Sequence, residues 1–401
     1  MHVLFVHKNF PAQFGHVARA LIDEHGWACS FVSELPPANI AGIQRYQYRT
    51  KSGATKSTHF CSRTFENSIW HSHAVYEAMK DHQEVRPDLV VGHSGFGSTL
   101  YLADLYDCPI INYFEYYYHS RGSDMDFRPD FKLGEMSNLR ARSRNAMLLL
   151  DLETCTRGYS PTLWQRERFP DSYQHKLETI HDGIDTDLWT RVPVKFRGWG
   201  DMEIPPETRI VTYVSRGFES MRGFDIFMEV AKRVCAARDD VIFLCVGSDR
   251  VCYGGDLRNI EENSYKEHVI NQGNYDLSRF IFTGTIPPIM LRDVLSMSDL
   301  HIYLTVPFVL SWSMLNALAC GCTVLSSEVG PVQEFITHGE NGLLADFFDI
   351  DRLSELALQV LDDPEGHRVL GNAGAELIRK KYSSEVVFPQ IVELYRSVAQ
   401  G

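Results

Sequence analysis

Short apolar runs alternate with amphipathic stretches along most of the 401-residue chain. In the first half, these runs predict buried strands at residues 3–6, 28–32, 89–91 and 109–114. Between them we expect helices at residues 17–24, after the Gly-His-Ser-Gly of residues 92–95 through residue 105, and at 133–149. Buried strands that alternate with helices predict a parallel, doubly wound α/β sheet.

The alternation stops between residues 190 and 207, where proline, glycine, tryptophan and charged residues dominate, as is typical of a linker. It then resumes, with strands expected at 210–214, 241–246, 280–283, 300–304 and 323–325, and helices at 224–236, near 260–272, and up to 296. We therefore predict two Rossmann-like domains, residues 1–190 and 208–382, which are joined by a linker at 191–207 and face each other across a cleft. Residues 384–399 have the period of a further helix.

Composition excludes several classes of partner. The net charge of −13 argues against nucleic acid and against an acidic membrane surface. The nine cysteines contain no C-x-x-C pair, so we expect free buried thiols, as at Cys320 and Cys322, and a reducing cytoplasmic location. No apolar run approaches the roughly 20 residues of a transmembrane segment. The oligomeric state is open, with a homodimer as one possibility.

Residues 299–344 are the most informative about chemistry. An apolar strand leads into a loop, a helix begins near Ser311, and a second strand follows, which together form a βαβ unit. A loop that feeds a helix N-terminus in such a unit is a site for phosphate, because free N–H groups and the helix dipole point at it. Ser311 is the expected N-cap of this helix.

This segment resembles the donor-binding segment of the family 4 retaining glycosyltransferases, which have a GT-B fold. The family pattern is roughly S-x-x-E-G-F-G-L-x-x-x-E-A-M-A-C-G-x-P-V-V, followed by G-G-x-x-E and G-x-x-G-L-L. Here the matches are residues 319–321, Val324, Gly330, Glu334 and residues 339–344. The two glutamates of the E-x7-E motif are replaced, the first by Phe308 and the second by Asn316.

The resemblance implies a fold and a reaction. Residues 1–190 would be the acceptor side, residues 208–382 the donor side, and a helix within 383–401 would cross back to the first domain. The enzyme would move a sugar from a nucleotide-diphospho-sugar, its co-substrate, to a small-molecule or glycan acceptor with retention of configuration. The family needs no bound metal and no further cofactor, and the chain has no Asp-x-Asp metal signature in a suitable loop.

The resemblance also implies a set of donor-site residues. The first motif glutamate contacts the donor sugar and the second contacts the ribose in the family. Without a carboxylate at position 308, sugar hydroxyls would depend on backbone N–H groups of the loop before the helix, and Asn316 would make a weaker, uncharged bond to the ribose. The donor-binding residues expected here are Gly15, Phe308, Val309, Leu310, Ser311, Asn316 and Glu334.

Two arginines are the expected catalytic cations. Arg216 and Arg222 follow the strand at 210–214, where the family has a pair of cations that hold the donor diphosphate. Guanidinium groups suit phosphate and would stabilise charge on the leaving diphosphate. The alternative is that both are solvated loop arginines. The third catalytic candidate is His93 in the glycine-rich residues 92–97, where a family histidine contacts the donor sugar. A loop histidine bonded to backbone is its alternative.

Acceptor contacts are expected from two loops of the first domain. Glu115, Tyr116 and Arg121 lie in an aromatic segment that follows the strand at 109–114, and His16 follows Gly15 in the first strand–helix turn. Aromatic faces pack on sugars or apolar bodies. Packing of the tyrosines at a domain interface is the alternative.

Other functions stay open on the sequence alone. A nucleotide-sugar epimerase or hydrolase with the same fold would need a carboxylate acid/base pair. A non-catalytic binding subunit would follow from loss of both motif glutamates. A flavin or nicotinamide enzyme is disfavoured because no G-x-G-x-x-G follows the first strand.

Overall fold

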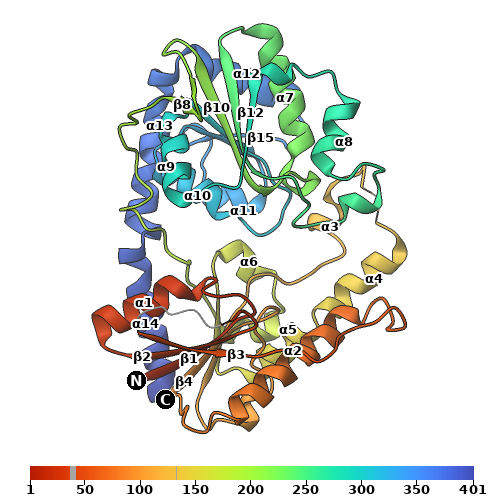
Figure 1. Cartoon of the computed structure of the whole chain (residues 1–401), viewed down its shortest axis with the longest axis vertical. Helices are drawn as coiled ribbons and strands as arrows, with labels where there is room; N and C mark the ends of the chain where they lie inside the picture. The colour runs from red at the N-terminus through yellow and green to blue at the C-terminus, as the bar shows by residue number, and fades with distance from the viewer. Residues whose placement is uncertain (37–41, 132) are drawn as a thin grey trace. The chain divides into compact units, whose positions relative to one another are not determined.

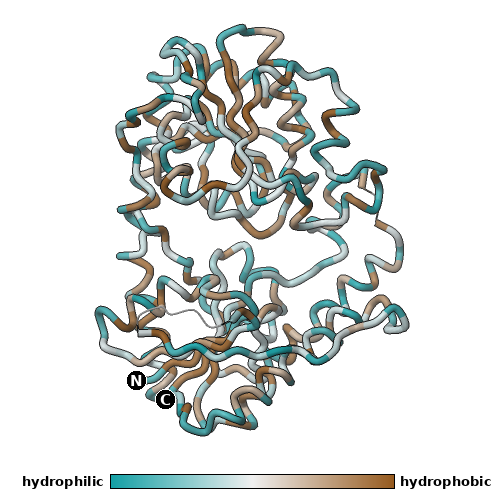
Figure 2. The backbone as a smooth tube through the Cα atoms, viewed as in Figure 1, coloured by the Kyte–Doolittle hydropathy of each residue, from teal (hydrophilic) through white to brown (hydrophobic). Residues whose placement is uncertain are grey.

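The computed structural model describes residues 1–36, 42–131 and 133–401. The chain forms two compact units, the first made of Met1–Gly183 with Glu385–Gly401 and the second of Ile184–Ser384 (Figure 1). Hydrophobic residues concentrate along the central strands of both units (Figure 2). None of the helices in the described residues has the length and apolar character that a membrane crossing requires.

The first unit is built on a seven-stranded parallel sheet with the order β3-β2-β1-β4-β5-β6-β7. The order reverses between β1 and β4, which is the topological switch point, where ligands bind at the carboxyl ends of the strands in doubly wound sheets. The strands are β1 (His2–Val6), β2 (Ala28–Ser33), β3 (Ile43–Gln47), β4 (Leu89–His93), β5 (Ile110–Tyr113), β6 (Arg157–Ser160) and β7 (Leu177–Thr179).

Both faces of this sheet are covered, as the continuous apolar strands require. On one face, Phe5 packs in a core with α1 (Phe14–His25) and α14 (Ser384–Gln400). On the other, Leu4 packs with α2 (Arg63–Lys80) and α5 (Ala146–Thr154). The last helix of the chain therefore belongs to the first unit. The other helices are α3 (Asp124–Phe127), α4 (Glu135–Arg144) and α6 (Leu163–Glu167).

Two helix predictions need correction in this unit, and one helix was not predicted. The helix expected through residue 105 is replaced by turns and one short 3₁₀ segment, η1 (Leu102–Asp104). The helix expected at 133–149 is two helices that meet at Asn145, whose side chain bonds the backbone N–H and C=O of Tyr118. Helix α2 was not predicted, because only Ser72, Val75 and Met79 of its eighteen residues are buried and its apolar stripe is thin.

The second unit has a six-stranded parallel sheet with the order β12-β11-β10-β13-β14-β15 and its switch point between β10 and β13. The prediction of two Rossmann-like domains is therefore confirmed. The strands are β10 (Arg209–Gly217), β11 (Val241–Ser248), β12 (Phe280–Gly284), β13 (Leu300–Tyr303), β14 (Val324–Ser327) and β15 (Leu343–Ala345). The helices are α7 (Phe224–Ala237), α8 (Tyr265–Gln272), α9 (Pro288–Met297), α10 (Trp312–Ala319), α11 (Gly330–Gln333), α12 (Ile350–Asp362) and α13 (Pro364–Leu377).

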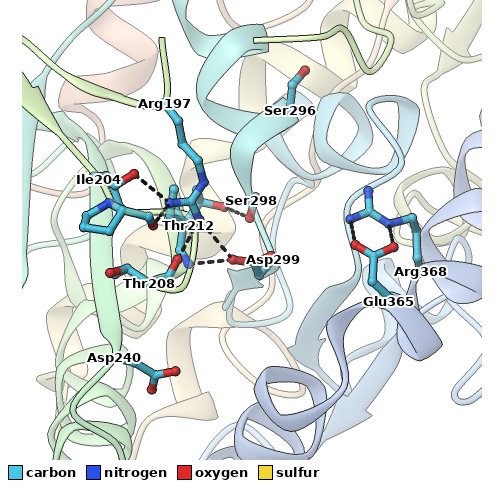
Figure 3. Close-up of polar contacts among 12 residues, drawn as sticks. Arg197, Ile204, Thr208, Thr212, Asp240, Ser296, Ser298, Asp299, Glu365 and Arg368 are labelled. Carbon is cyan, nitrogen blue, oxygen red and sulfur yellow. Dashed lines mark hydrogen bonds and ion pairs between the residues drawn. The ribbon is translucent and has the colours of Figure 1, made fainter. Parts of the chain in front are cut away.

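Residues 191–207, the predicted linker, lie within the second unit. They contain a small hairpin, β8 (Gly198–Trp199) with β9 (Met202–Glu203). The Arg197 guanidinium donates to the carbonyls of Ile204 (3.1 Å) and Thr208 (2.6 Å) and lies 3.8 Å from the Asp299 carboxylate (Figure 3). Arg197 thereby holds this segment against the amino ends of β10 and β13.

All nine cysteines are free, and Cys320 and Cys322 are buried, as predicted. Burial raises the pKa of Cys322 to about 12, so this thiol is inert at neutral pH.

Candidate active site

At the switch point of the second unit, Arg222 connects two loops. It ends the 3₁₀ turn η3 (Ser220–Arg222) that follows β10, and its guanidinium reaches the loop after β13. Nη1 donates to the Tyr303 hydroxyl (3.1 Å) and the Thr305 hydroxyl (2.7 Å), and Nη2 donates to the Val309 carbonyl (3.0 Å). Only 4% of Arg222 is exposed. The sequence indicated a phosphate-facing cation here, and the structure adds a loop-to-loop clasp that no local pattern could reveal.

Arg222 keeps its charge in this buried position. Burial lowers the pKa of the guanidinium, but the neighbouring Tyr303 and Tyr253 oxygens and the Glu219 carboxylate outweigh burial, and the pKa is raised. The guanidinium carbon also lies 5.2 Å from the ring centre of Tyr253 and 6.0 Å from that of Phe308. Such contacts add cation–π attraction.

Tyr303 ties Arg222 to the N-terminus of α10. Its hydroxyl accepts a hydrogen bond from Arg222 and a second from the backbone N–H of Ser311, at 2.9 Å. The Ser311 side chain accepts from the backbone N–H of Ser313 at 3.3 Å, so the predicted N-cap is confirmed. The Ser311 N–H, one of the backbone groups expected to serve sugar hydroxyls, is bonded to the Tyr303 hydroxyl in this structure.

The residues at the replaced motif positions are largely buried. Phe308 and Asn316 are each 8% exposed, and Leu310 is 7% exposed. Phe308 packs edge-to-face on Tyr253, with ring centres 5.5 Å apart. The Asn316 side chain, on the second turn of α10, makes no hydrogen bond to the described residues.

Arg216 and Glu334 lie at the edges of this region. Arg216 is exposed near the end of strand β10, and its carbonyl accepts from the Ser248 hydroxyl (2.7 Å). Glu334 follows α11 and is half-buried. Burial, and after it the Glu334 carboxylate, raise the pKa of the Tyr382 hydroxyl.

Glu219 is a buried carboxylate that sequence reasoning did not assign to the site. Its Oε2 accepts from the backbone N–H groups of Cys252 (2.5 Å) and Tyr253 (2.8 Å), while Oε1 has no hydrogen-bond partner among the described residues. It is fully buried, and burial raises its pKa to about 7. Glu219 thus fastens the loop that carries Tyr253 beside Arg222. A glutamate in a loop gives no sequence signal for such a role.

The switch point of the first unit carries two buried histidines. His93 ends β4, is fully buried, and lies edge-to-face with His7 from the end of β1, with ring centres 5.1 Å apart. Burial and then the neighbouring His7 lower the pKa of His93 to about 3, and burial lowers that of His7 to about 4. Both imidazoles are therefore neutral at pH 7. His7 was not among the predicted site residues.

The glycine-rich loop packs tightly on this pair. Gly97 pairs with His93 in a β-bridge, and a Cβ on Gly97 would lie 2.2 Å from the Val6 carbonyl oxygen. Gly95 has a φ of +94°. Only glycine permits both the close approach and this backbone, which explains why a loop replaces the expected helix.

His93 makes polar contacts on both ring nitrogens. Nδ1 lies 3.0 Å from the Ser94 carbonyl, which can only accept, so Nδ1 carries the proton. Nε2 then accepts from the Gln13 amide (3.3 Å) and lies 3.9 Å from the Glu115 carboxylate. The structure therefore brings His93 and Glu115 together, as a shared site requires.

The other predicted residues of this unit are spread more widely. Tyr116 is 4% exposed and donates its hydroxyl to Asp124 (2.7 Å). His16, on the first turn of α1, and Arg121 are exposed. Gly15 lies against Pro11, where a Cβ would be 2.6 Å from the proline Cβ. The fixed contact of Tyr116 favours packing over direct acceptor binding for this residue.

Comparisons with known proteins agree with this architecture. Residues 25–189 match the family model described as "Glycosyl transferase family 4 group", and residues 201–377 match "Glycosyl transferases group 1". The chain is 32% identical over 108 residues to N-acetyl-alpha-D-glucosaminyl L-malate synthase of Bacillus anthracis. It is 28% identical over 182 residues to a GDP-mannose-dependent mannosyltransferase of Corynebacterium glutamicum, "GDP-mannose-dependent monoacylated alpha-(1-6)-phosphatidylinositol monomannoside mannosyltransferase". These matches cover 27% and 44% of this chain and span 28% and 44% of the two relatives' own length.

Solved structures share the fold over nearly the whole chain. Sucrose-phosphate synthase from Thermosynechococcus elongatus superposes with a TM-score of 0.76 at 19% identity, covering 99% of this chain and 98% of that one. Anabaena HepE, solved in complex with UDP-glucose, gives a TM-score of 0.66 at 14% identity over 99% of this chain and all of its own. With a family model on each half and two Rossmann-like sheets, the chain belongs to the family 4 glycosyltransferases and has the GT-B fold.

Proposed function

We propose that this glycosyltransferase moves a sugar from a nucleotide-diphospho-sugar to a small-molecule or glycan acceptor, with retention of configuration and without a divalent metal. The observation that carries the proposal is the place of Arg222. It bridges the loops after β10 and β13 at the switch point, and through Tyr303 it is joined to the N-terminus of α10. Phosphate groups bind at such positions in doubly wound sheets.

The diphosphate would be held by cations and by the helix end. Arg222 has five N–H groups and uses three on the described residues, so two remain for phosphate oxygens. Arg216 lies exposed in the same turn region and can approach the diphosphate from solvent. The dipole of α10 adds positive potential at its N-terminus.

These groups would also lower the barrier of the reaction. The bond between the anomeric carbon and the diphosphate oxygen breaks as the acceptor hydroxyl oxygen bonds to that carbon from the same face. The leaving diphosphate oxygen takes the acceptor's proton, so no side-chain nucleophile is needed. Negative charge grows on the diphosphate during this step, and fixed guanidinium groups stabilise it more than they stabilise the bound donor.

His93 is the residue of the first unit that we propose for a sugar contact. With the proton on Nδ1, the neutral His93 ring offers Nε2 as an acceptor for a sugar hydroxyl, in place of the Gln13 amide. Glu115, half-buried beside it, is the carboxylate that we propose for a contact with an acceptor hydroxyl. Both roles follow from the shared position of the two side chains at the carboxyl ends of β4 and β5.

The relatives support a nucleotide-sugar donor without naming it. HepE was solved with UDP-glucose, while the mannosyltransferase relative depends on GDP-mannose. The base and the sugar therefore differ among similar proteins. Phe308 and Asn316 at the motif positions make this chain's own donor a question for direct binding measurements.

Thermal unfolding against UDP, GDP, ADP, dTDP and CMP, and then against their sugars, tests the proposal. A nucleotide at a hundred times its dissociation constant should stabilise the protein by about 2.7 kcal/mol. Arg216→Ala should abolish the shift. Arg352→Ala, which removes an exposed arginine of α12, is the matched control and should retain it.

Each other outcome has a defined meaning. No shift with any nucleotide would overturn the donor proposal and favour a non-catalytic binding subunit. Binding followed by conversion of the sugar in the absence of any acceptor would favour a nucleotide-sugar epimerase or hydrolase. Equal loss of binding in Arg216→Ala and Arg352→Ala would show that surface charge, not a site, is responsible.

A further inference from the structure

Asp151 is a buried carboxylate with no cation beside it. It lies on α5, is fully buried, and forms no ion pair with the described residues. Its two oxygens accept hydrogen bonds from two serine hydroxyls, Oδ2 from Ser94 at 2.7 Å and Oδ1 from Ser98 at 2.9 Å. Burying a charge without a cation costs folding free energy. Such a carboxylate can still hold neighbouring groups in place through hydrogen bonds, which an apolar side chain cannot do.

The two serines flank the glycine-rich turn at the carboxyl end of β4. Between them lie Gly95, Phe96 and Gly97. The two glycines have no side chain to hold the loop in place, and half of the Phe96 side chain is exposed. Asp151 therefore clamps both ends of this turn from the neighbouring helix. Serine donors on a carboxylate are charge-assisted, so each clamp is stronger than a neutral hydrogen bond.

Ser94 links this clamp to His93. The Ser94 hydroxyl is held by Asp151, the Ser94 N–H donates to the Tyr113 carbonyl at 2.9 Å, and the Ser94 carbonyl accepts from His93 Nδ1 at 3.0 Å. The position of that carbonyl decides which ring nitrogen carries the proton. Ser98 shares the carboxylate but makes no contact with His93 among the described residues.

We propose that Asp151 is a positioning residue for glycosyl transfer. Through Ser94 it fixes the carbonyl that accepts the hydrogen bond from His93 Nδ1–H. The Nε2 lone pair is thereby kept directed toward Gln13 and Glu115. This rests on the proposed function, in which His93 Nε2 accepts from the donor sugar. Asp151 itself touches no substrate.

Nitrogen NMR on protein labelled with ¹⁵N-histidine tests the chain of contacts without any substrate. His93→Gln identifies the His93 signals by their loss. The wild type should show a neutral His93 with the proton on Nδ1 between pH 6 and 8. Ser94→Ala should mix the two tautomers, and Ser98→Ala should keep the wild-type pattern. A proton on Nε2 in the wild type, or an unchanged tautomer in Ser94→Ala, would overturn the proposal.

Turnover of the donor identified by the nucleotide panel gives the second readout. Ser94→Ala should lower kcat about tenfold with little change in the donor KM, because the contact matters most in the transition state. Ser98→Ala, with a similar loss of stability, should lower kcat no more than about twofold. Asp151→Asn, which keeps an acceptor for Ser94, should recover most of the activity lost in Asp151→Ala.

The same experiment separates the two proposals. If His93→Gln leaves kcat unchanged, the sugar contact assigned to His93 fails, and with it the proposed function of that residue. If His93→Gln lowers kcat strongly while Ser94→Ala and Ser98→Ala behave alike, the His93 contact stands and the positioning role of Asp151 is wrong.

Discussion

Removing one hydroxyl at Tyr303 should uncouple the arginine loop from helix α10. Tyr303 is 2% exposed, and its hydroxyl is the shared acceptor for Arg222 Nη1 and for the Ser311 N–H. Tyr303→Phe keeps the ring and its packing, so the change is confined to these two hydrogen bonds.

The magnitude follows from the bonds that are lost. A neutral N–H bond such as that of Ser311 contributes about 1 kcal/mol, and a bond from a guanidinium about 1.5–3 kcal/mol. Arg222 keeps its bonds to Thr305 and Val309, which offset part of the loss. We therefore expect the free energy of unfolding of the second unit to fall by about 2 kcal/mol, somewhat less than the sum of about 2.5–4 kcal/mol for the two bonds.

Hydrogen exchange measures this effect at the bond itself. The Ser311 amide should lose about 30-fold in protection, the equivalent of 2 kcal/mol, while amides in β11 change only with global stability. Nucleotide affinity should fall with it, because the helix end and Arg222 no longer act as one unit. Tyr275→Phe, which removes a single half-buried bond to Glu229 (2.7 Å), is the matched control and should leave Ser311 exchange unchanged.

Equal exchange at Ser311 in wild type and Tyr303→Phe, together with a change in unfolding free energy below about 0.5 kcal/mol, would refute the coupling. Arg222 would then be held by Thr305 and Val309 alone, and the Tyr303 hydroxyl would not couple it to α10.

Two further predictions concern charge in buried places. Asn316→Glu should tighten nucleotide binding about tenfold in calorimetry, because a carboxylate bonds a ribose hydroxyl more strongly than an amide does. Asn316→Gln is the uncharged control. If Asn316→Glu does not tighten binding, Asn316 does not face the ribose. Acid should destabilise the first unit: burial lowers the pKa of His7, His93 and His181 to about 4, 3 and 4, so stability is full above pH 6.5 and falls toward pH 4. At pH 5.5 each buried histidine lowers the free energy of unfolding by about 1.4 kcal/mol. Asp151 offsets part of this loss, because burial raises its pKa to about 6. A Tm that does not change from pH 7 to pH 5 would contradict this prediction.

The sequence by itself determined the parts that depend on local pattern. The more apolar strands of both sheets, the N-cap at Ser311 and the buried free thiols Cys320 and Cys322 follow from apolar runs, from capping preference and from composition. The strands β3, β6, β7 and β15 were not predicted. A short apolar strand has few ways to be buried, so the alternation of such strands with helices indicates a doubly wound sheet. The family resemblance could be read from the sequence because its matching residues, 319–321, Val324, Gly330, Glu334 and 339–344, lie in one short segment.

Only the tertiary structure decided how the site is assembled. Arg222 and Val309 are 87 positions apart, and Ser94 and Asp151 are 57 apart, yet each pair is joined by a hydrogen bond. No local preference encodes which of many loop side chains will meet. The helix expected through residue 105 was wrong because Gly97 must pass within reach of Val6 on another strand. Loops take their conformation from the elements they touch, and those contacts exist only once the sheet has formed.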